Sequence, residues 1–135
     1  MKNLIIATAV LICLPLGCAS ISEHGKMEAY GRTMDSYGTA LRLSDFNAVC
    51  QYIDPMVMGR SDCMKRYENM KIVSYDLLGV TVAKDRREVT QAVEVEYYFL
   101  DRYVVKKIGF EQSWRYREDM KDWLLQTSPP HFEPR

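Results

Sequence analysis

The chain has 135 residues, of which 47% are hydrophobic and 27% are charged, and its 18 basic and 18 acidic side chains cancel. This length fits a single globular domain. Because the two signs balance and are scattered along the chain, the composition argues against a nucleic-acid partner, which would need a basic surface.

The first 17 residues have the layout of a secretory signal peptide. Lys2 supplies a positive start, residues 4–16 carry no charge, and small residues follow at Gly17 and Ala19. The uncharged run is shorter than the ~20 apolar residues that a membrane-spanning helix needs. We therefore predict that residues 1–17 are a targeting segment removed by cleavage.

The end of this segment, Leu16-Gly17-Cys18, resembles the lipobox of bacterial lipoproteins, in which a small residue precedes a cysteine that is lipidated and becomes the first residue. The resemblance implies that Cys18 carries acyl chains and ties the protein to the periplasmic side of a bacterial membrane. Ala19 is not the aspartate that favours inner-membrane retention in enteric lipoproteins, so the outer membrane is expected. The alternative is ordinary cleavage nearby, which would leave Cys18 an unmodified thiol.

Two further cysteines, Cys50 and Cys63, lie in the mature chain. An oxidising periplasm would permit them to pair, and a bridge closing so short a loop would contribute ~3 kcal/mol in the chain-entropy model. The alternative is a pair of buried free thiols that behave as small hydrophobic side chains.

The first half of the mature chain reads as helical. Residues 18–25 form a small, polar tether behind the lipid, and the domain begins at residue 26. A second helix starts at a Ser44 or Asp45 cap and stops at Asp54-Pro55, and a third starts at a Ser61-Asp62 cap. The first helix precedes these two. The spacing of apolar residues predicts it over residues 27–41, with a buried stripe of Met27, Tyr30, Met34, Tyr37 and Leu41.

The pattern of the second half predicts long strands. We predict four of them, over residues 71–84, 88–101, 103–117 and 122–127, with a turn at 85–87. The proline-rich tail, residues 128–135, cannot join a ladder of strands. In the third strand, Val104, Ile108, Phe110, Trp114 and Tyr116 should share a face. In the second, the apolar face is Val89, Gln91, Val93, Val95, Tyr97 and Phe99.

Helices followed by an antiparallel meander predict an α+β domain over residues 26–127, with the N-terminal helices packed on a curved sheet of about four strands. The stretches YGTALRLSDFNAVCQYIDP and QSWRYREDMKDWLLQT resemble the first helical hairpin and the closing strand hairpin of the nuclear-transport-factor-2-like, or cystatin-like, superfamily. The resemblance implies a cone between helices and sheet. Members of that superfamily include isomerases, dehydratases and epoxide hydrolases, and also domains with no reaction.

A pocket in such a cone would be lined by inward-pointing side chains. Tyr97 and Asp76 together could imitate the tyrosine and acid of a ketosteroid-isomerase-like site, although Tyr97 also suits a core position. Whether Tyr75 or Asp76 points inward depends on which face of that strand is concave. Met56 and Met58 lie between the helices, where they either contact a ligand or partner or plug the core. The candidate pocket is Tyr75, Gln91, Tyr97, Gln112, Trp114, Met56 and Met58.

The sequence offers little support for metal, cofactor or nucleophilic chemistry. His24 and His131 fall in the tether and the tail, and we find no metal-ligand spacing, Ser-His-Asp set or phosphate-binding glycine loop, so neither a metal nor a cofactor is expected. Glu94 and Glu96 alternate with the apolar face of their strand. We expect them to be solvated and to pair with Lys107 or Arg115 across strands.

These features together predict a membrane-anchored periplasmic lipoprotein whose domain binds or positions a partner and catalyses no reaction. The partner would be another envelope protein or a second copy of the chain. The alternative is a small apolar ligand, carried or isomerised in the cone.

Overall fold

The computed structural model describes residues 18–133, and for residues 18–22 it describes the backbone alone. The predicted signal peptide, including Leu16 and Gly17 of the lipobox, lies outside the described residues. Three helices precede four strands: α1 (Cys18–Arg42), α2 (Phe46–Val49), α3 (Arg60–Arg66), β1 (Met70–Val82), β2 (Glu88–Phe99), β3 (Lys106–Arg117) and β4 (Asp122–Leu125).

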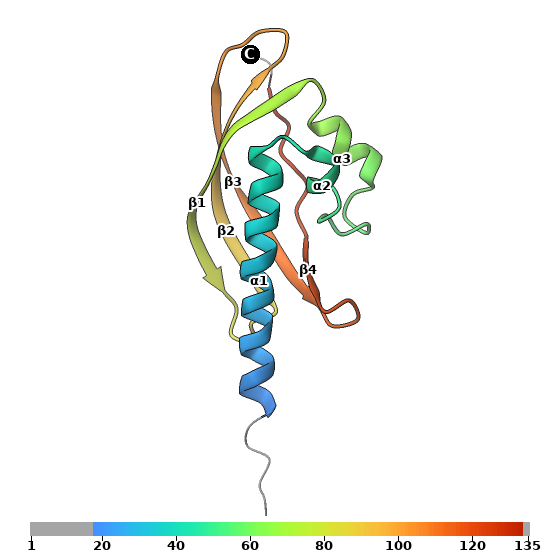
Figure 1. Ribbon diagram of the computed structural model, residues 1–135, viewed down its shortest axis with the longest axis vertical. Helices are drawn as coiled ribbons and strands as arrows, with labels where there is room; N and C mark the ends of the chain where they lie inside the picture. The colour runs from blue at the N-terminus through green and yellow to red at the C-terminus, as the bar shows by residue number, and fades with distance from the viewer. Residues whose placement is uncertain (1–17, 134–135) are drawn as a thin grey trace, which may run out of the picture.

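The strands form one sheet in the order β1-β2-β3-β4, each antiparallel to the next. The sheet is curved, and α1 lies along its concave side with α2 and α3 beside the upper part of the sheet (Figure 1). The predicted fold class, an α+β domain of N-terminal helices packed on a curved four-stranded antiparallel sheet, is confirmed. Among the described residues, no helix combines the length and the apolar character needed to cross a membrane.

Helix α1 buries the predicted stripe, with Tyr37 and Leu41 at 1% and 3% exposure. It begins at Cys18, so residues 18–25, which we expected as an extended tether, are helical instead. Lys26 holds this end of the helix to the sheet. Its Nζ lies 3.1 Å from Glu118 of the β3–β4 turn, and its carbonyl accepts a 2.8 Å hydrogen bond from Trp123 Nε1.

The two shorter helices differ from prediction in their ends. Asp45 caps α2 by accepting a hydrogen bond from the Ala48 N–H, but α2 ends at Val49 rather than at residue 53. The chain turns there because Ile53 forms a parallel bridge with Leu125 of β4. Helix α3 begins at Arg60 after Gly59, so the expected Ser61-Asp62 cap is wrong.

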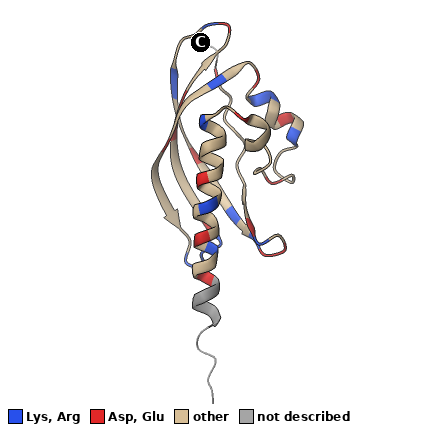
Figure 2. Ribbon diagram, viewed as in Figure 1, with Lys and Arg blue, Asp and Glu red and all other residues tan. Residues whose placement is uncertain are grey.

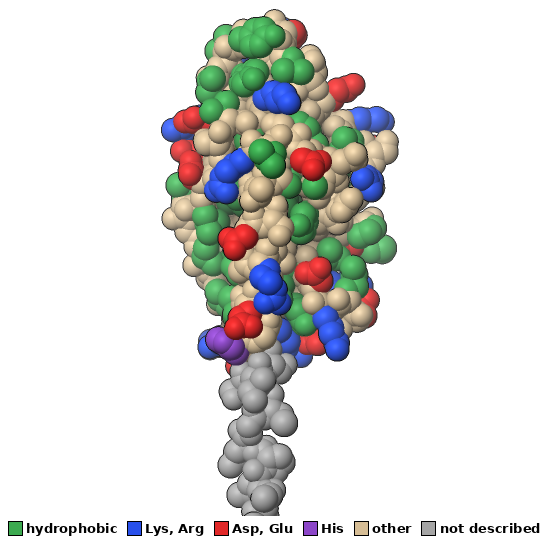
Figure 3. Space-filling model, in the orientation of Figure 1, with side chains coloured by type: hydrophobic (Ala, Val, Ile, Leu, Met, Phe, Trp, Pro, Cys, Tyr) green, Lys and Arg blue, Asp and Glu red, His purple; other side chains and the backbone are tan. Residues whose placement is uncertain are grey.

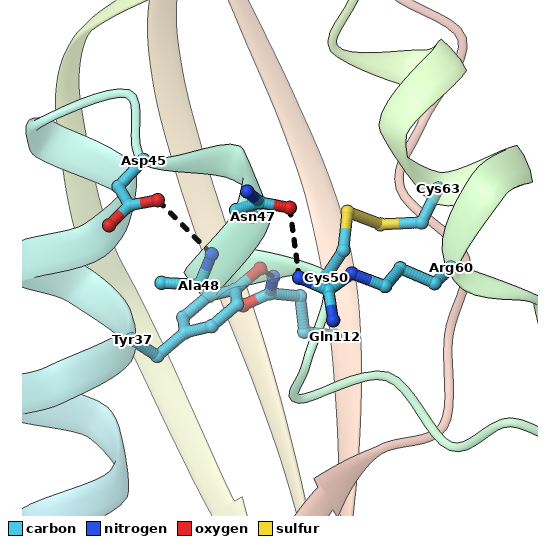
Figure 4. Close-up of a disulfide and its surroundings, with 8 residues drawn as sticks. All are labelled: Tyr37, Asp45, Asn47, Ala48, Cys50, Arg60, Cys63 and Gln112. Atoms are coloured by element: carbon cyan, nitrogen blue, oxygen red, sulfur yellow. Dashed lines mark hydrogen bonds between the residues drawn. A yellow bond between two sulfur atoms is a disulfide. The ribbon is translucent and has the colours of Figure 1, made fainter.

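A disulfide joins Cys50, at the end of α2, to Cys63 of α3, with the two Cα atoms 5.9 Å apart (Figure 4). A second link runs parallel to it, because Arg60 Nη2 donates a 2.8 Å hydrogen bond to Asn47 Oδ1. The two short helices are therefore tied together at both the sulfur bridge and the surface.

The faces of β2 are as predicted, with Val89, Val93 and Val95 almost fully buried. Strand β3 starts at Lys106 rather than at residue 103, so Val104 lies in the β2–β3 loop, 59% exposed, and not on the apolar face. Strand β1 has register irregularities between Ile72 and Ser74 and between Leu77 and Gly79. These bulges shift the alternation of its side chains, which sequence periodicity could not reveal.

The tail joins no strand, as predicted, yet it packs against the domain. Phe132 lies with its ring centroid 4.9 Å from that of Tyr97 and 5.5 Å from that of Tyr67, and Pro129 is buried. Arg66 Nη1 donates a 2.9 Å hydrogen bond to the carbonyl of Pro129. Residues 129–133 therefore close one end of the core.

Candidate functional site

The interior between α1 and the sheet contains a network of polar side chains. Tyr30 of α1 donates a 2.6 Å hydrogen bond to Gln91 Oε1, and Gln91 Nε2 donates to Gln112 Oε1 at 2.9 Å and to the Tyr75 hydroxyl at 3.1 Å. The Tyr75 hydroxyl in turn donates to Gln112 Oε1 at 2.9 Å, and Gln112 Nε2 donates to the Tyr37 hydroxyl at 3.0 Å. One helix and three strands thus meet in a closed set of hydrogen bonds, which we call the interior network.

Each element contributes to the interior network for a local reason. Tyr30 and Tyr37 are seven residues apart on α1, so they project from one face of the helix. Gln91 and Gln112 are direct cross-strand partners of β2 and β3. Tyr75 points inward because the bulge after Ile72 shifts the alternation of β1. The two glutamines were correctly predicted to face inward, but their tyrosine partners could not be assigned from sequence.

The phenols of this region are held neutral. Burial raises the pKa of Tyr30 to about 12, and burial raises the pKa of Tyr37, Tyr67 and Tyr75 well above the usual value for tyrosine. A raised pKa keeps these phenols protonated near neutral pH, so they remain able to donate hydrogen bonds.

The predicted pair of Asp76 and Tyr97 does not come together. Asp76 is exposed and lies opposite Glu94 on the outer side of the sheet. Tyr97 is 3% exposed on the inner side, and its hydroxyl donates a 3.3 Å hydrogen bond to the carbonyl of Glu133 in the tail. The two groups therefore face opposite sides of the sheet and cannot contact one substrate.

The remaining pocket candidates make no hydrogen bond to the interior network. Met56 is 90% exposed, and Met58 packs half-buried against the core. Trp114 is fully buried with Tyr37 packed edge-on against it at 5.0 Å, and its Nε1 has no hydrogen-bond partner. Of the seven candidates, Tyr75, Gln91 and Gln112 are brought together, and Tyr97, Trp114, Met56 and Met58 are not hydrogen-bonded to them.

The structure shows a buried carboxylate, Asp54, whose role the sequence did not predict. Asp54, read there only as a helix stop, is 5% exposed and accepts hydrogen bonds from the Met56 N–H (2.9 Å), from Arg117 Nη1 (3.2 Å) and from Gln126 Nε2 (3.2 Å). The Met56 hydrogen bond, with those from Gln126 and Arg117, lowers the pKa of this carboxyl. Asp54 thus fixes the loop between α2 and α3 to the end of β3 and to the residue that follows β4.

Charged residues of both signs are dispersed along the helices, strands and loops (Figure 2). Lys107 bridges Glu94 and Glu96 at 3.3 and 3.5 Å, as predicted, whereas Arg115 pairs with Glu88 at 2.9 Å. Within residues 23–133, no group of three or more His, Cys, Asp or Glu side chains is arranged to hold a metal ion.

Two open grooves lie on the surface of the domain, and Tyr75 of the interior network lines one of them. One of about 350 Å³ runs between α1 and β1 and is lined by Met34, Arg42, Tyr75 and Leu77 among others. Another, of about 740 Å³, lies beside α3, where the Phe46 and Tyr67 rings stack at 4.5 Å next to Met64.

No protein-family model matches the chain, and no curated protein matches it. Among solved structures, a protein from Xanthomonas campestris pv. campestris that is provisionally named a polyketide cyclase is similar, with a TM-score of 0.49 and 12% sequence identity. The alignment covers 75% of this chain and 90% of that one. A likeness of this extent establishes neither a family nor a function for the chain.

Proposed function

We propose that the protein is a lipid-anchored protein of the bacterial envelope whose domain acts by binding a partner rather than by catalysis. It would be attached through Cys18 to the periplasmic face of a membrane, the outer one rather than the inner. The lipobox-like LGC motif supports the anchor. The observation that supports a binding role is the interior network, which fills the centre of the domain.

A substrate in the centre of the domain would have to displace that network. Its five hydrogen bonds join side chains of which Gln91 and Gln112 are 1% and 2% exposed. Each bond is worth about 1 kcal/mol net, and each buried group left unpaired costs about 1–3 kcal/mol more. A ligand that could not replace these bonds would therefore be excluded, so the network suits a structural role.

The surface offers apolar side chains of the kind that partners bind. Leu100, Tyr103, Val104 and Val105 are exposed in and next to the β2–β3 loop. Figure 3 shows hydrophobic side chains gathered at that end of the molecule, away from the start of α1. A helix of 25 residues is about 37 Å long. An anchor at Cys18 would therefore present the far end of the domain to other envelope proteins.

The anchor is tested by replacing Cys18 in cells that are supplied with an alkyne fatty acid. Cys18→Ser should abolish acyl labelling and release the protein from the membrane fraction, because the thiol is the attachment point. Cys13→Ser, in the predicted signal peptide, is the matched control and should keep its label. A wild-type mass without acyl groups would contradict the anchor, and the intact mass also identifies any uncleaved signal segment.

A small apolar ligand is the second candidate, and the groove beside α3 is the feature that favours it. Its stacked Phe46 and Tyr67 rings and the adaptable Met64 would suit a flat or flexible apolar molecule. Titration with a fluorescent fatty acid would detect such binding. Affinity that Met64→Glu weakens about tenfold or more would support this candidate, and affinity that is unchanged in this variant would reject it.

A further inference from the structure

The ammonium of Lys106, the first residue of β3, is buried without a partner. In the part of the chain that the structure describes, its Nζ is shielded from solvent and no group accepts a hydrogen bond from it. The next residue shows the contrast, because the exposed Lys107 bridges Glu94 and Glu96. Burying a charge is costly unless an opposite charge or hydrogen bonds compensate for it. The position of Lys106 therefore favours an anion that the described residues do not supply.

Lys106 borders a third groove, of about 460 Å³, on the inner side of the sheet. It is the direct cross-strand partner of the buried Tyr97, and Ile108 follows two residues later on the same face of β3. Tyr97 and Ile108 both line the groove. A cation and an apolar wall therefore lie side by side.

The tail forms the other wall of this groove. His131 and Glu133 line it, and the Tyr97 hydroxyl donates a 3.3 Å hydrogen bond to the Glu133 carbonyl. Lys107 also lines the groove, but its ammonium is already paired. Glu133 is exposed, and its carboxylate accepts no hydrogen bond from Lys106. Because the Glu133 carboxylate repels other negative charges, the groove suits an anion with one negative charge rather than two.

We propose that this groove binds a small monocarboxylate that carries an apolar group. The carboxylate pairs with the ammonium of Lys106, which reaches the groove by rotation about its flexible stem. The apolar group lies against Tyr97 and Ile108. Lysine supplies a single compact charge, whereas a phosphate dianion is held better by the planar fork of arginine or by several donors.

This inference goes beyond the proposed function and does not depend on the anchor. The residues that line the groove do not belong to the interior network. The start of β3 and the tail lie at the end of the domain away from the start of α1 (Figure 1). A bilayer at Cys18 would leave the groove uncovered, so the ligand enters from the aqueous side. Failure of this site would leave the anchor unaffected.

The probe is 3-phenylpropionate, and its neutral isostere 3-phenylpropionamide is the matched control ligand. Each is titrated into the full processed protein in detergent, and the amide resonance of Ile108 is followed by NMR. We expect the carboxylate to bind with a dissociation constant on the order of 1 mM, as suits a ligand of this size, and the amide to bind about tenfold more weakly or less. A ligand held this weakly leaves the protein during extraction from the membrane.

Variants of Lys106 test the role of its charge. Lys106→Met keeps most of the apolar stem and removes the charge, so it should bind both ligands equally weakly, and Lys106→Arg should retain the preference for the carboxylate. Lys84→Met, at an exposed lysine of the β1–β2 turn, is the matched control and should bind as the wild type does. Because Lys106→Met removes a buried unpaired charge, its urea midpoint should not fall below that of the wild type.

Several results would overturn the proposal. These are equal binding of the carboxylate and the amide to the wild type, no binding of either, or a preference for the carboxylate that persists in Lys106→Met. Tighter binding of phenyl phosphate than of 3-phenylpropionate would also contradict it, because the site would then select a dianion. A urea midpoint that falls in Lys106→Met would show that the ammonium has a structural partner, which likewise contradicts the proposal.

Discussion

Removing Gln112 should show that the interior network stabilises the fold. Gln112→Leu keeps the side-chain volume nearly constant but removes the acceptor for Tyr75 and Gln91 and the donor to Tyr37, at 2.9, 2.9 and 3.0 Å. Three hydrogen bonds at about 1 kcal/mol each, with the Tyr75 hydroxyl left without an acceptor, predict a loss of about 2–4 kcal/mol in the free energy of unfolding. Gln51→Leu, on the exposed surface, should change it by less than about 0.5 kcal/mol.

The pairing of Gln112 with Tyr75 can be isolated in a double-mutant cycle. Gln112→Leu leaves the Tyr75 hydroxyl without an acceptor, and Tyr75→Phe removes that hydroxyl. The double variant should therefore lose about 1–2 kcal/mol less unfolding free energy than the sum of the two single variants. Urea unfolding followed by tryptophan fluorescence measures all four proteins, with the slope unchanged if the unfolded state is unaffected. Losses that add to within about 0.5 kcal/mol, or a Gln112→Leu loss below about 1 kcal/mol, would refute the reasoning.

Three further predictions concern the disulfide, the buried carboxylate and the tail. Reductant should lower the unfolding free energy by about 3 kcal/mol through the Cys50–Cys63 bridge, and Cys50→Ala/Cys63→Ala should be insensitive to it. Since the folded-state pKa of Asp54 is lowered, its contribution to stability is present above the unfolded pKa and disappears as pH falls through the folded one. Asp54→Asn should therefore destabilise the fold at pH 7 in urea titrations, with a difference from wild type that shrinks as pH falls below the usual range for aspartate. Phe132→Ala should lower the thermal midpoint by opening the core beside Tyr97, and an unchanged midpoint would show that the tail is not part of the fold.

Regular periodicity made much of the fold predictable. The stripe on α1 and the alternation on β2 gave the correct buried faces, because one helix and one strand each repeat a simple period against a single core. The sequence left open which face of β1 points inward, because a local irregularity decides it. The bulge after Ile72 turns Tyr75 inward and Asp76 outward, and nothing in the local pattern places an extra residue at that point.

The candidate site was only partly predictable for a different reason. Gln91 and Gln112 stand out as polar residues on apolar faces, a signal visible in the sequence. Their partner Tyr30 is 61 residues from Gln91, so this pairing depends on how α1 crosses the sheet. Asp54 likewise pairs with Arg117, which is 63 residues away, and its local sequence indicates only the end of a helix.

The central claim is that an acylated chain carries a domain with a closed interior. Intact mass of the protein extracted gently from membranes, measured under native and then denaturing conditions, tests it most directly. We predict equal masses in both states, each corresponding to the chain from Cys18 plus its acyl groups. A native mass that exceeds the denatured one by a small molecule, which Tyr75→Phe releases, would contradict the closed interior, and a mass without acyl groups would contradict the anchor.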